Sequence, residues 1–160
     1  MRYNHSLLMR KGNNMDQKIQ DFIQLKKLAV VGVSRSDKKF GTAIYKELKE
    51  RGFNVYGVNP QMDSIDGDKC YPALSELKGK VDGVVICLPP QKAANIIREA
   101  AAAGITKIWL QQGSQSFETK KAAREVSVTP VEGKCILMYA GEVTSIHAFH
   151  KFFAKVFGQY

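Results

Sequence analysis

One stretch constrains the fold of this chain more than any other: residues 28–52, LAVVGVSRSDKKFGTAIYKELKERG. It opens with a run of small and β-branched apolar residues, which is typical of a strand buried in a parallel sheet. From about Thr42 the pattern changes, because Phe40, Ile44 and Leu48 lie four positions apart and a glycine closes the stretch. This spacing predicts a helix with a glycine cap.

The loop between this strand and this helix predicts an anion site. A helix that begins above such a loop directs its first, unpaired N–H groups at whatever lies there, and these groups attract phosphate above all. Arg35, Lys38 and Lys39 add positive charge to the same loop. We therefore interpret the loop as a phosphate cradle.

Composition narrows the class of protein. A chain of 160 residues with 44% hydrophobic and 24% charged residues is expected to form a single soluble domain. No apolar run approaches the roughly 18 residues that cross a bilayer, and the first residues lack the apolar core of a secretory signal. We therefore expect a cytoplasmic protein without a membrane segment.

The formal net charge of +9 is spread along the chain, with no basic run longer than two residues. Aromatic residues are not interleaved with the basic ones, which argues against a nucleic-acid platform. An anionic small ligand accounts for the charge at least as well.

The cysteines are Cys70, Cys87 and Cys135. Their odd number, wide spacing and lack of a CxxC pattern argue against a zinc site and a disulfide framework. Reduced thiols are the expected state. Cys135 has two interpretations, a buried structural thiol or a partner for a mixed disulfide with a ligand thiol.

The rest of the chain alternates strands and helices. We expect residues 1–14 to form a disordered N-terminal extension and residues 15–160 to form the domain, which opens with a short helix from about Asp16. Further strands are expected over 53–58, 81–88, 105–110 and 127–131, with a connecting segment over 62–77. Helices are expected over 92–103 and 117–126 and as a last helix with Ile146, Phe149, Phe153 and Phe157 on one stripe. This order predicts an α/β, Rossmann-like, doubly wound parallel sheet of about five strands in three layers.

In such a sheet ligands bind beyond the carboxyl ends of the strands. These ends are predicted at residues 32–34, 58–60, 87–90 and 110–113. A dinucleotide site needs G-x-G-x-x-G and an acid after the second strand. Here Ser34 stands where the second glycine belongs, and Val58-Asn59-Pro60 offers no acid, so both departures count against NAD.

The segments GVSRSDKKFG, YGVNP, CLPPQKAANIIREAAAAGITKIWLQQG and EGKCILMY, in this order, resemble the CoA-binding domain family. This family comprises small proteins related to the nucleotide-binding domain of the succinyl-CoA synthetase alpha subunit. The resemblance runs from about Lys27 to the C-terminus and implies coenzyme A or acyl-CoA as the ligand.

The resemblance also implies which residues meet the ligand. Gly32, Val33 and Ser34 would lie against the pyrophosphate, and Lys38 or Lys39 would meet phosphate charge beside Arg35. Asn59 and Pro60 would border the nucleotide. Leu88, Pro89 and Pro90 would border the adenosine or pantetheine part of the ligand. Gln111, Gln112 and Gly113 would contact the pantetheine arm.

No catalytic or metal-binding set is expected. The ligases of this kind use a phosphorylated histidine on a domain that has no counterpart here. His147 and His150 lie three apart without carboxylates or cysteines at ligand spacing, which favours packing or surface roles. The expected function is non-catalytic binding of CoA. Two alternatives stay open: an NAD(P)-dependent oxidoreductase or nucleotide-sensing regulator, and an interaction module whose terminal helix docks a partner enzyme.

Overall fold

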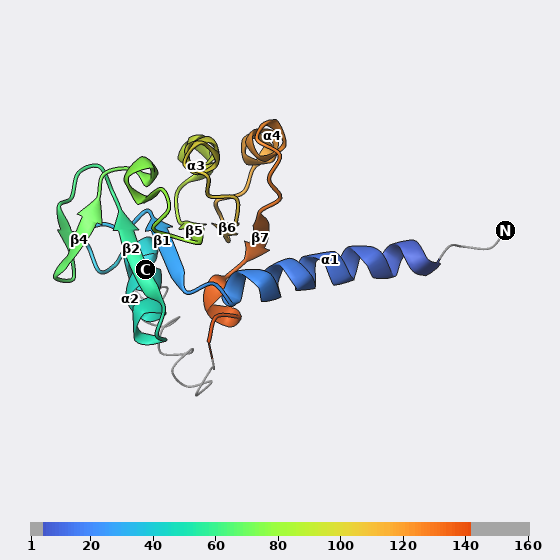
Figure 1. Ribbon diagram of the computed structural model, residues 1–160, viewed down its shortest axis with the longest axis horizontal. Helices are drawn as coiled ribbons and strands as arrows, with labels where there is room; N and C mark the ends of the chain where they lie inside the picture. Colours follow the sequence, from blue (N-terminus) through green and yellow to red (C-terminus); the bar gives the residue numbers. More distant parts are fainter. Residues whose placement is uncertain (1–4, 142–160) are drawn as a thin grey trace.

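The computed structural model describes residues 5–141, with side chains from Asn14 onward. Its centre is a seven-stranded sheet in the order β3-β4-β2-β1-β5-β6-β7 (Figure 1). The strands are β1 (Lys27–Val31), β2 (Asn54–Val58), β3 (Ser64–Ile65), β4 (Asp68–Tyr71), β5 (Gly83–Ile86), β6 (Ile108–Gln111) and β7 (Val131–Lys134). All pairs are parallel except β3 with β4. The predicted α/β, Rossmann-like fold is confirmed.

Helices cover both faces of this sheet, which gives three layers (Figure 1). The end of α1 (His5–Ile23), α2 (Phe40–Glu50) and the 3₁₀ turn η2 (Ile136–Met138) lie on one face. On the other face lie α3 (Pro90–Ala102), α4 (Phe117–Glu125) and the 3₁₀ turn η1 (Leu74–Leu77). None of the helices in residues 5–141 has the length and hydropathy to span a membrane.

Strand β1 is the centre of the core because it is buried on both faces, as its apolar run predicted. Leu28 and Val30 pack among the residues of α1, α2 and η2. Ala29 and Val31 pack toward α3, α4 and η1. Side chains alternate across a strand, so a run without a polar residue can only be accommodated between two covered faces.

The segment predicted as a connection after β2 contains the hairpin β3–β4 instead, so the sheet has more strands than expected. The turn at Asp66-Gly67 has φ values of 51° and 81°. Two consecutive positive φ values are typical of the tight hairpin turn that matches the twist of the flanking strands, and Asp-Gly is a preferred sequence for it. Ile65 and Cys70 are buried as a result.

Two further boundaries differ from the predictions. The last strand begins at Val131 rather than at Ser127, because Ser127 adopts a positive φ of 55° and Pro130 cannot donate to a ladder. Helix α1 begins at His5, not near Asp16. Residues 7–11 are strong helix formers, and one glycine does not stop the helix. The predicted terminal helix, with His147 and His150, lies outside the described residues.

Candidate functional site

The four predicted strand ends meet at one edge of the sheet. The parallel register pairs Val31 with Val58 on one side and with Ile86 on the other, and Ile86 pairs with Leu110. The chain leaves all four strands toward the same edge. The predicted binding residues therefore gather along one line across β2, β1, β5 and β6.

The loop after β1 requires glycine at its first position. Gly32 has a φ of +111°, and a Cβ there would lie 2.2 Å from the carbonyl oxygen of Cys87. A Cβ on Gly41, in the first turn of α2, would lie 2.3 Å from the carbonyl oxygen of Gly32. The end of β1, the start of α2 and the end of β5 are thus in direct backbone contact, which places the N-terminus of α2 over the loop.

Ser34 and Thr42 hold the loop to α2. The N–H of Ser34 donates to Oγ1 of Thr42 at 2.8 Å, and Oγ1 of Thr42 donates to the carbonyl oxygen of Ser34 at 2.9 Å. The hydroxyl of Ser34 accepts a hydrogen bond from the N–H of Ser36 and donates one to the carbonyl oxygen of Ser36. Thr42 was not among the predicted site residues. The sequence signal that could have identified Thr42 is its hydroxyl in the first turn of the predicted helix.

Helix α2 begins without a side-chain cap. Its N-cap is Lys39, whose side chain makes no capping hydrogen bond, and its first turn has no acidic residue. Helix α4, by contrast, is closed by Ser116 and Thr119 in a capping box. Since the N-terminus of a helix carries a partial positive charge, the uncapped start of α2 is suited to an anion.

The loop is also cationic. Lys46 forms a 2.8 Å ion pair with Asp37, the one acidic side chain of the loop. Arg35 donates through Nη2 to the carbonyl oxygen of Gln61 at 3.3 Å, while Lys38 and Lys39 are exposed. Within the described part of the chain, no salt bridge involves Arg35, Lys38 or Lys39.

Asn59 joins the end of β2 to this loop. Its Nδ2 donates to the carbonyl oxygen of Val33 at 2.7 Å, and its Oδ1 accepts from the N–H of Gln61 at 2.8 Å. The side chain that follows β2 is therefore an amide that hydrogen-bonds the protein's own backbone. It is not a carboxylate that could bind a ribose hydroxyl. Pro60 follows it and is exposed.

Ser114 joins the two remaining strand ends. Its hydroxyl is within 2.7 Å of the carbonyl oxygen of Leu88 and 3.2 Å of that of Ile86. Leu88, Pro89 and Pro90, the last of which begins α3, are thereby held next to residues 111–113. Pro89 is the N-cap of α3 and provides no side-chain cap either.

The glutamines after β6 have different environments. Gln111 is 1% exposed, and its Oε1 accepts from the N–H of Ile136 at 3.1 Å. Gln112 is exposed. Gly113 has a φ of +96° and donates its N–H to Oε1 of Gln115 at 2.9 Å. Gln112 and Gly113 thus lie at the surface of the edge, whereas Gln111 points into the fold.

The cysteines are free thiols. Cys70 and Cys135 are buried, and desolvation strongly raises the pKa of the Cys87 thiol. Thiols of this kind are poor nucleophiles because the thiolate is the reactive form. Among residues 5–141, no three His, Cys, Asp or Glu side chains lie close enough to hold a metal ion.

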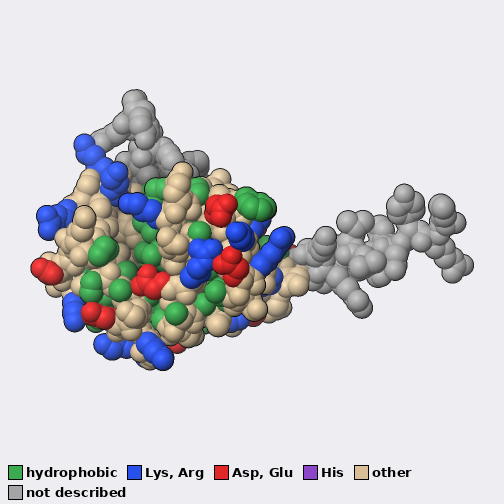
Figure 2. Space-filling view, turned by 90° about the horizontal axis from the view of Figure 1, so that it is seen from above, with side chains coloured by type: hydrophobic (Ala, Val, Ile, Leu, Met, Phe, Trp, Pro, Cys, Tyr) green, Lys and Arg blue, Asp and Glu red, His purple; other side chains and the backbone are tan. Residues whose placement is uncertain are grey.

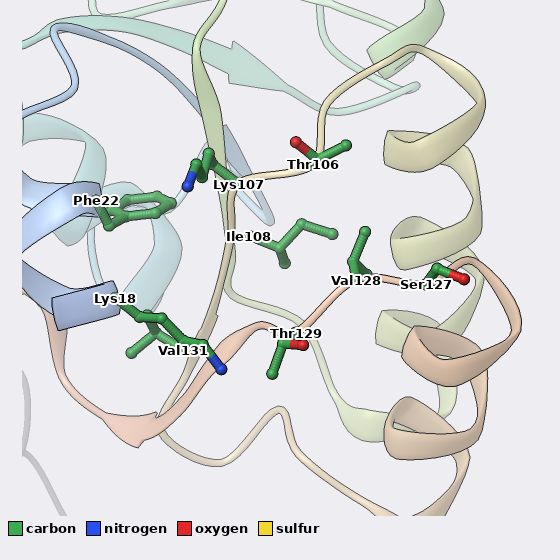
Figure 3. A pocket seen from close by; sticks show the side chains of 9 residues that line it. All are labelled: Lys18, Phe22, Thr106, Lys107, Ile108, Ser127, Val128, Thr129 and Val131. Carbon is green, nitrogen blue, oxygen red and sulfur yellow. The ribbon is translucent and has the colours of Figure 1, made fainter. Parts of the chain in front are cut away.

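Of two hollows at the ends of the strands, one borders the site. One of about 220 Å³ lies beside the loop and is lined by residues of the loop, of α2 and of β3, among them Ser34, Arg35 and Thr42. Another of about 230 Å³ lies where β6 and β7 begin, with Phe22 and Ile108 among its lining residues (Figure 3). The second hollow is at the opposite edge of the sheet and contains none of the predicted site residues.

The surface over α3 and α4 does not resemble a nucleic-acid platform. Figure 2 shows Lys and Arg side chains interspersed with acidic and apolar ones on the face seen from above. A continuous basic stripe would be expected for a phosphate backbone.

A mostly parallel sheet whose first strand, β1, passes through a loop that begins with Gly32 into helix α2 defines a Rossmann-like α/β protein. The sequence profile of the CoA binding domain family matches residues 26–140. The chain therefore belongs to the CoA-binding domain family.

Its relatives include both large ligases and small proteins. An ADP-forming acetate–CoA ligase II from Archaeoglobus fulgidus is 34% identical over 107 residues, which are 66% of this chain but 16% of the ligase. The chain thus spans less than a fifth of the length of that ligase. The uncharacterized protein YneT of Bacillus subtilis is 26% identical over 125 residues, covering 78% of this chain and 93% of YneT.

A solved structure, a conserved hypothetical protein from Pyrococcus furiosus, superposes with a TM-score of 0.68 at 38% identity. The match covers 71% of this chain and 97% of that one. Proteins of nearly the same extent as this domain therefore exist alongside the ligases.

Proposed function

We propose that this protein binds coenzyme A or an acyl-CoA at the carboxyl edge of the sheet and has no catalytic machinery of its own. The proposal is carried by what lies at the N-terminus of α2. The N-cap of this helix, Lys39, makes no side-chain capping hydrogen bond, and the helix begins over the loop 32–39, where Gly32 and Gly41 are in backbone contact. Among residues 14–141 no salt bridge pairs Arg35, Lys38 or Lys39 with a carboxylate.

The residues present suit a ligand with several phosphate charges. Gly32, Val33 and Ser34 would lie along the pyrophosphate, and Arg35, Lys38 and Lys39 would meet its charge and that of the 3′-phosphate. The nucleotide would be bordered by Asn59 and Pro60. The arm would run past Leu88, Pro89, Pro90, Gln112 and Gly113.

The same edge is poorly suited to NAD. A dinucleotide site holds the adenosine ribose with a carboxylate after the second strand. Here the corresponding side chain is the amide of Asn59. Its nitrogen already donates to the carbonyl oxygen of Val33 in the loop, and its oxygen already accepts from the N–H of Gln61.

The non-catalytic role is supported by the relatives. The chain matches a small part of the ligases and most of the length of YneT. A binding function needs only the cradle, whereas the ligase reaction needs groups from the rest of those proteins. The cytoplasmic location stays a prediction.

Thermal unfolding of the purified protein with CoA, dephospho-CoA or NADH tests the proposal. At a ligand concentration about 100 times Kd, binding raises the midpoint by roughly 5–10 °C for a domain of this size. We expect this rise with CoA and a smaller one with dephospho-CoA. Stabilisation by NADH and not by CoA would overturn the proposal.

A further inference from the structure

The outer face of α4 carries a large apolar side chain among cations. Phe117, the first residue of the helix, is 74% exposed, more than any other large hydrophobic side chain in residues 14–141. Lys120, Lys121 and Arg124 follow it at spacings of three, four and seven residues. These spacings place all four side chains on one face of a helix, which we call the outer face of α4.

This face is presented on a helix that is fixed at both ends. Ala122 and Ala123, on the opposite side of α4, are buried in the core between the helix and the sheet. The capping box that begins at Ser116 holds the first turn. Near the other end, Nε of Arg98 on α3 donates to Oε2 of Glu125 at 2.8 Å. A partner would therefore meet side chains on a backbone that is already in place.

A shallow hollow of about 210 Å³ lies on this face, lined by Phe117, Lys120, Lys121, Arg124 and Glu125. The carboxylate in this lining, that of Glu125, is already engaged, because the hydrogen bond from Arg98 lowers its pKa. In the part of the chain that the structure describes, no salt bridge involves Lys120, Lys121 or Arg124. The hollow therefore combines an exposed ring with three cations that lack a carboxylate partner.

Charge and apolar surface together indicate the kind of occupant. Cations without a carboxylate partner attract negative charge and favour a partner of complementary potential. The ring of Phe117 and the aliphatic stems of the lysines and the arginine offer apolar contact as well, which a small hydrated anion would not use. Aromatic side chains and arginine are also the residues that most often anchor protein interfaces. An acidic protein segment that carries an apolar side chain matches both properties.

Two other occupants are disfavoured. A second copy of this chain carries the same formal net charge of +9, so two copies repel each other. A nucleic-acid backbone is bound through contacts with several successive phosphates, and one face of a nine-residue helix offers only a short set of cations.

We propose that the outer face of α4 docks an acidic segment of another protein. An apolar side chain of that segment packs against Phe117, and its carboxylates pair with Lys120, Lys121 and Arg124. The inference does not rest on the proposed binding of CoA, because α4 contributes none of the residues assigned to that ligand. Phe117 is four residues beyond Gly113, so a docked segment would lie beside the carboxyl edge of the sheet.

Fluorescence anisotropy with labelled synthetic peptides tests the inference. The first peptide is rich in Glu with a Trp and a Leu at its centre, the second has Ser in place of the Trp and the Leu, and the third has Lys in place of every Glu. We expect the native protein to bind the first peptide about tenfold more tightly than the second, and not to bind the third. Equal affinities for the first two would mean that charge alone is recognised and would overturn the inference, as would no binding of the first.

The role of the ring is tested by Phe117→Ser, which should weaken binding of the first peptide about tenfold. The matched control is Met138→Ser, because Met138 is also exposed, at 54%, and lies in η2 on the other face of the sheet. Both changes are at exposed positions, so the midpoint of thermal unfolding should stay close to that of the native protein. An equal loss of peptide affinity in the two variants would overturn the inference.

The role of the cations is tested by Lys120→Gln with Lys121→Gln. This double variant should weaken binding of the first peptide about fivefold at low ionic strength, and less in high salt, because exposed charges are screened. The control is Lys26→Gln with Lys78→Gln, which removes the same charge from exposed lysines outside α4. The same loss in both double variants would assign the effect to net charge and contradict the inference.

The other two occupants are tested by sedimentation velocity of the chain alone and by titration with single-stranded DNA. Self-association or DNA binding that Phe117→Ser abolishes, in a protein that does not bind the first peptide, would show that the face has a different occupant. A protein that binds the first peptide but not CoA would support this inference and refute the proposed function.

Discussion

The hydroxyl of Tyr45 donates a 2.8 Å hydrogen bond to Oδ2 of Asp68. Tyr45 lies on α2 and Asp68 opens β4, so this contact holds the hairpin β3–β4 against the helix that begins at the candidate site. Lys49 donates to the same carboxylate oxygen. Burial and the neighbouring Asp68 raise the pKa of Tyr45, and the hydrogen bonds from Lys49 and Tyr45 lower the pKa of Asp68.

This contact predicts a dependence of stability on pH. A carboxyl group whose pKa is lowered by folding stabilises the fold above its unfolded pKa, near 3.9, and that contribution is lost as the pH falls further. Asp68→Asn should therefore lower the free energy of unfolding at pH 7 by less than about 1 kcal/mol, since the side chain is half exposed, and the difference should vanish near pH 2. Urea denaturation at both pH values measures it. A difference that persists at the acid pH would contradict this assignment.

Tyr45 predicts a loss of stability at alkaline pH. Its raised pKa means that the fold favours the neutral phenol, so this contribution is complete below pH 10 and is lost as the pH rises beyond it. Tyr45→Phe should flatten the decline of stability between about pH 10 and 11, the unfolded phenol having a pKa near 10. Thermal unfolding in alkaline buffers tests this, with Tyr56→Phe, a tyrosine on β2, as the comparison. Equal slopes in Tyr45→Phe and the native protein would refute it.

Gly32→Ala should destabilise the protein far more than the ordinary effect of a Gly→Ala change on backbone entropy would. The added Cβ would meet the carbonyl oxygen of Cys87 at 2.2 Å, in a left-handed region that L side chains avoid. We expect a loss of about 3 kcal/mol or more from the combined strain and displacement. Gly52→Ala is the control, because Gly52 also has a positive φ of +89° but nothing within 4 Å of an added Cβ. Denaturant unfolding of both should give a clearly smaller loss for Gly52→Ala, and equal losses would mean that the contact with Cys87 is relieved cheaply.

The Thr42 hydroxyl should matter for both loop and ligand. Thr42→Val keeps the shape of the side chain but leaves the N–H of Ser34 without its acceptor, at an expected cost of about 1–2 kcal/mol. Thr42→Ser keeps the hydroxyl and should restore most of the loss. The affinity for CoA should follow the same order in calorimetry. A loss in Thr42→Ser as large as that in Thr42→Val would contradict this role of the hydroxyl.

The loop cations should act through phosphate charge. Lys38→Ala with Lys39→Ala should weaken CoA binding about tenfold at low ionic strength, and less in high salt, because exposed charges are screened. The control removes the same charge from Lys26 and Lys107, exposed residues that precede β1 and β6 at the other edge. If both double variants lost the same affinity, net charge alone would be responsible and the loop would have no special role.

Local patterns predicted much of this architecture. The unbroken apolar run of β1 required cover on both faces, and the alternation of strands and helices defined the parallel sheet. The placing of the strand ends at one edge followed from the parallel direction. The hairpin β3–β4 was missed because its strands are too short for a periodic signal, although Ile65-Asp66-Gly67-Asp68 contains the turn that forms it.

The fold class, the cationic loop and its glycines could be predicted from the chain alone, because each depends on residues that are neighbours in sequence. Which polar side chains bond the protein's own backbone depends instead on contacts between distant segments. Asn59 bonds a loop 26 residues away and Gln111 bonds a turn 25 residues away, and no local pattern encodes such a contact. The physical reason is that a polar side chain at a strand end has the same sequence signature whether it faces a ligand or the backbone of another element, and the choice is made by what packs against it.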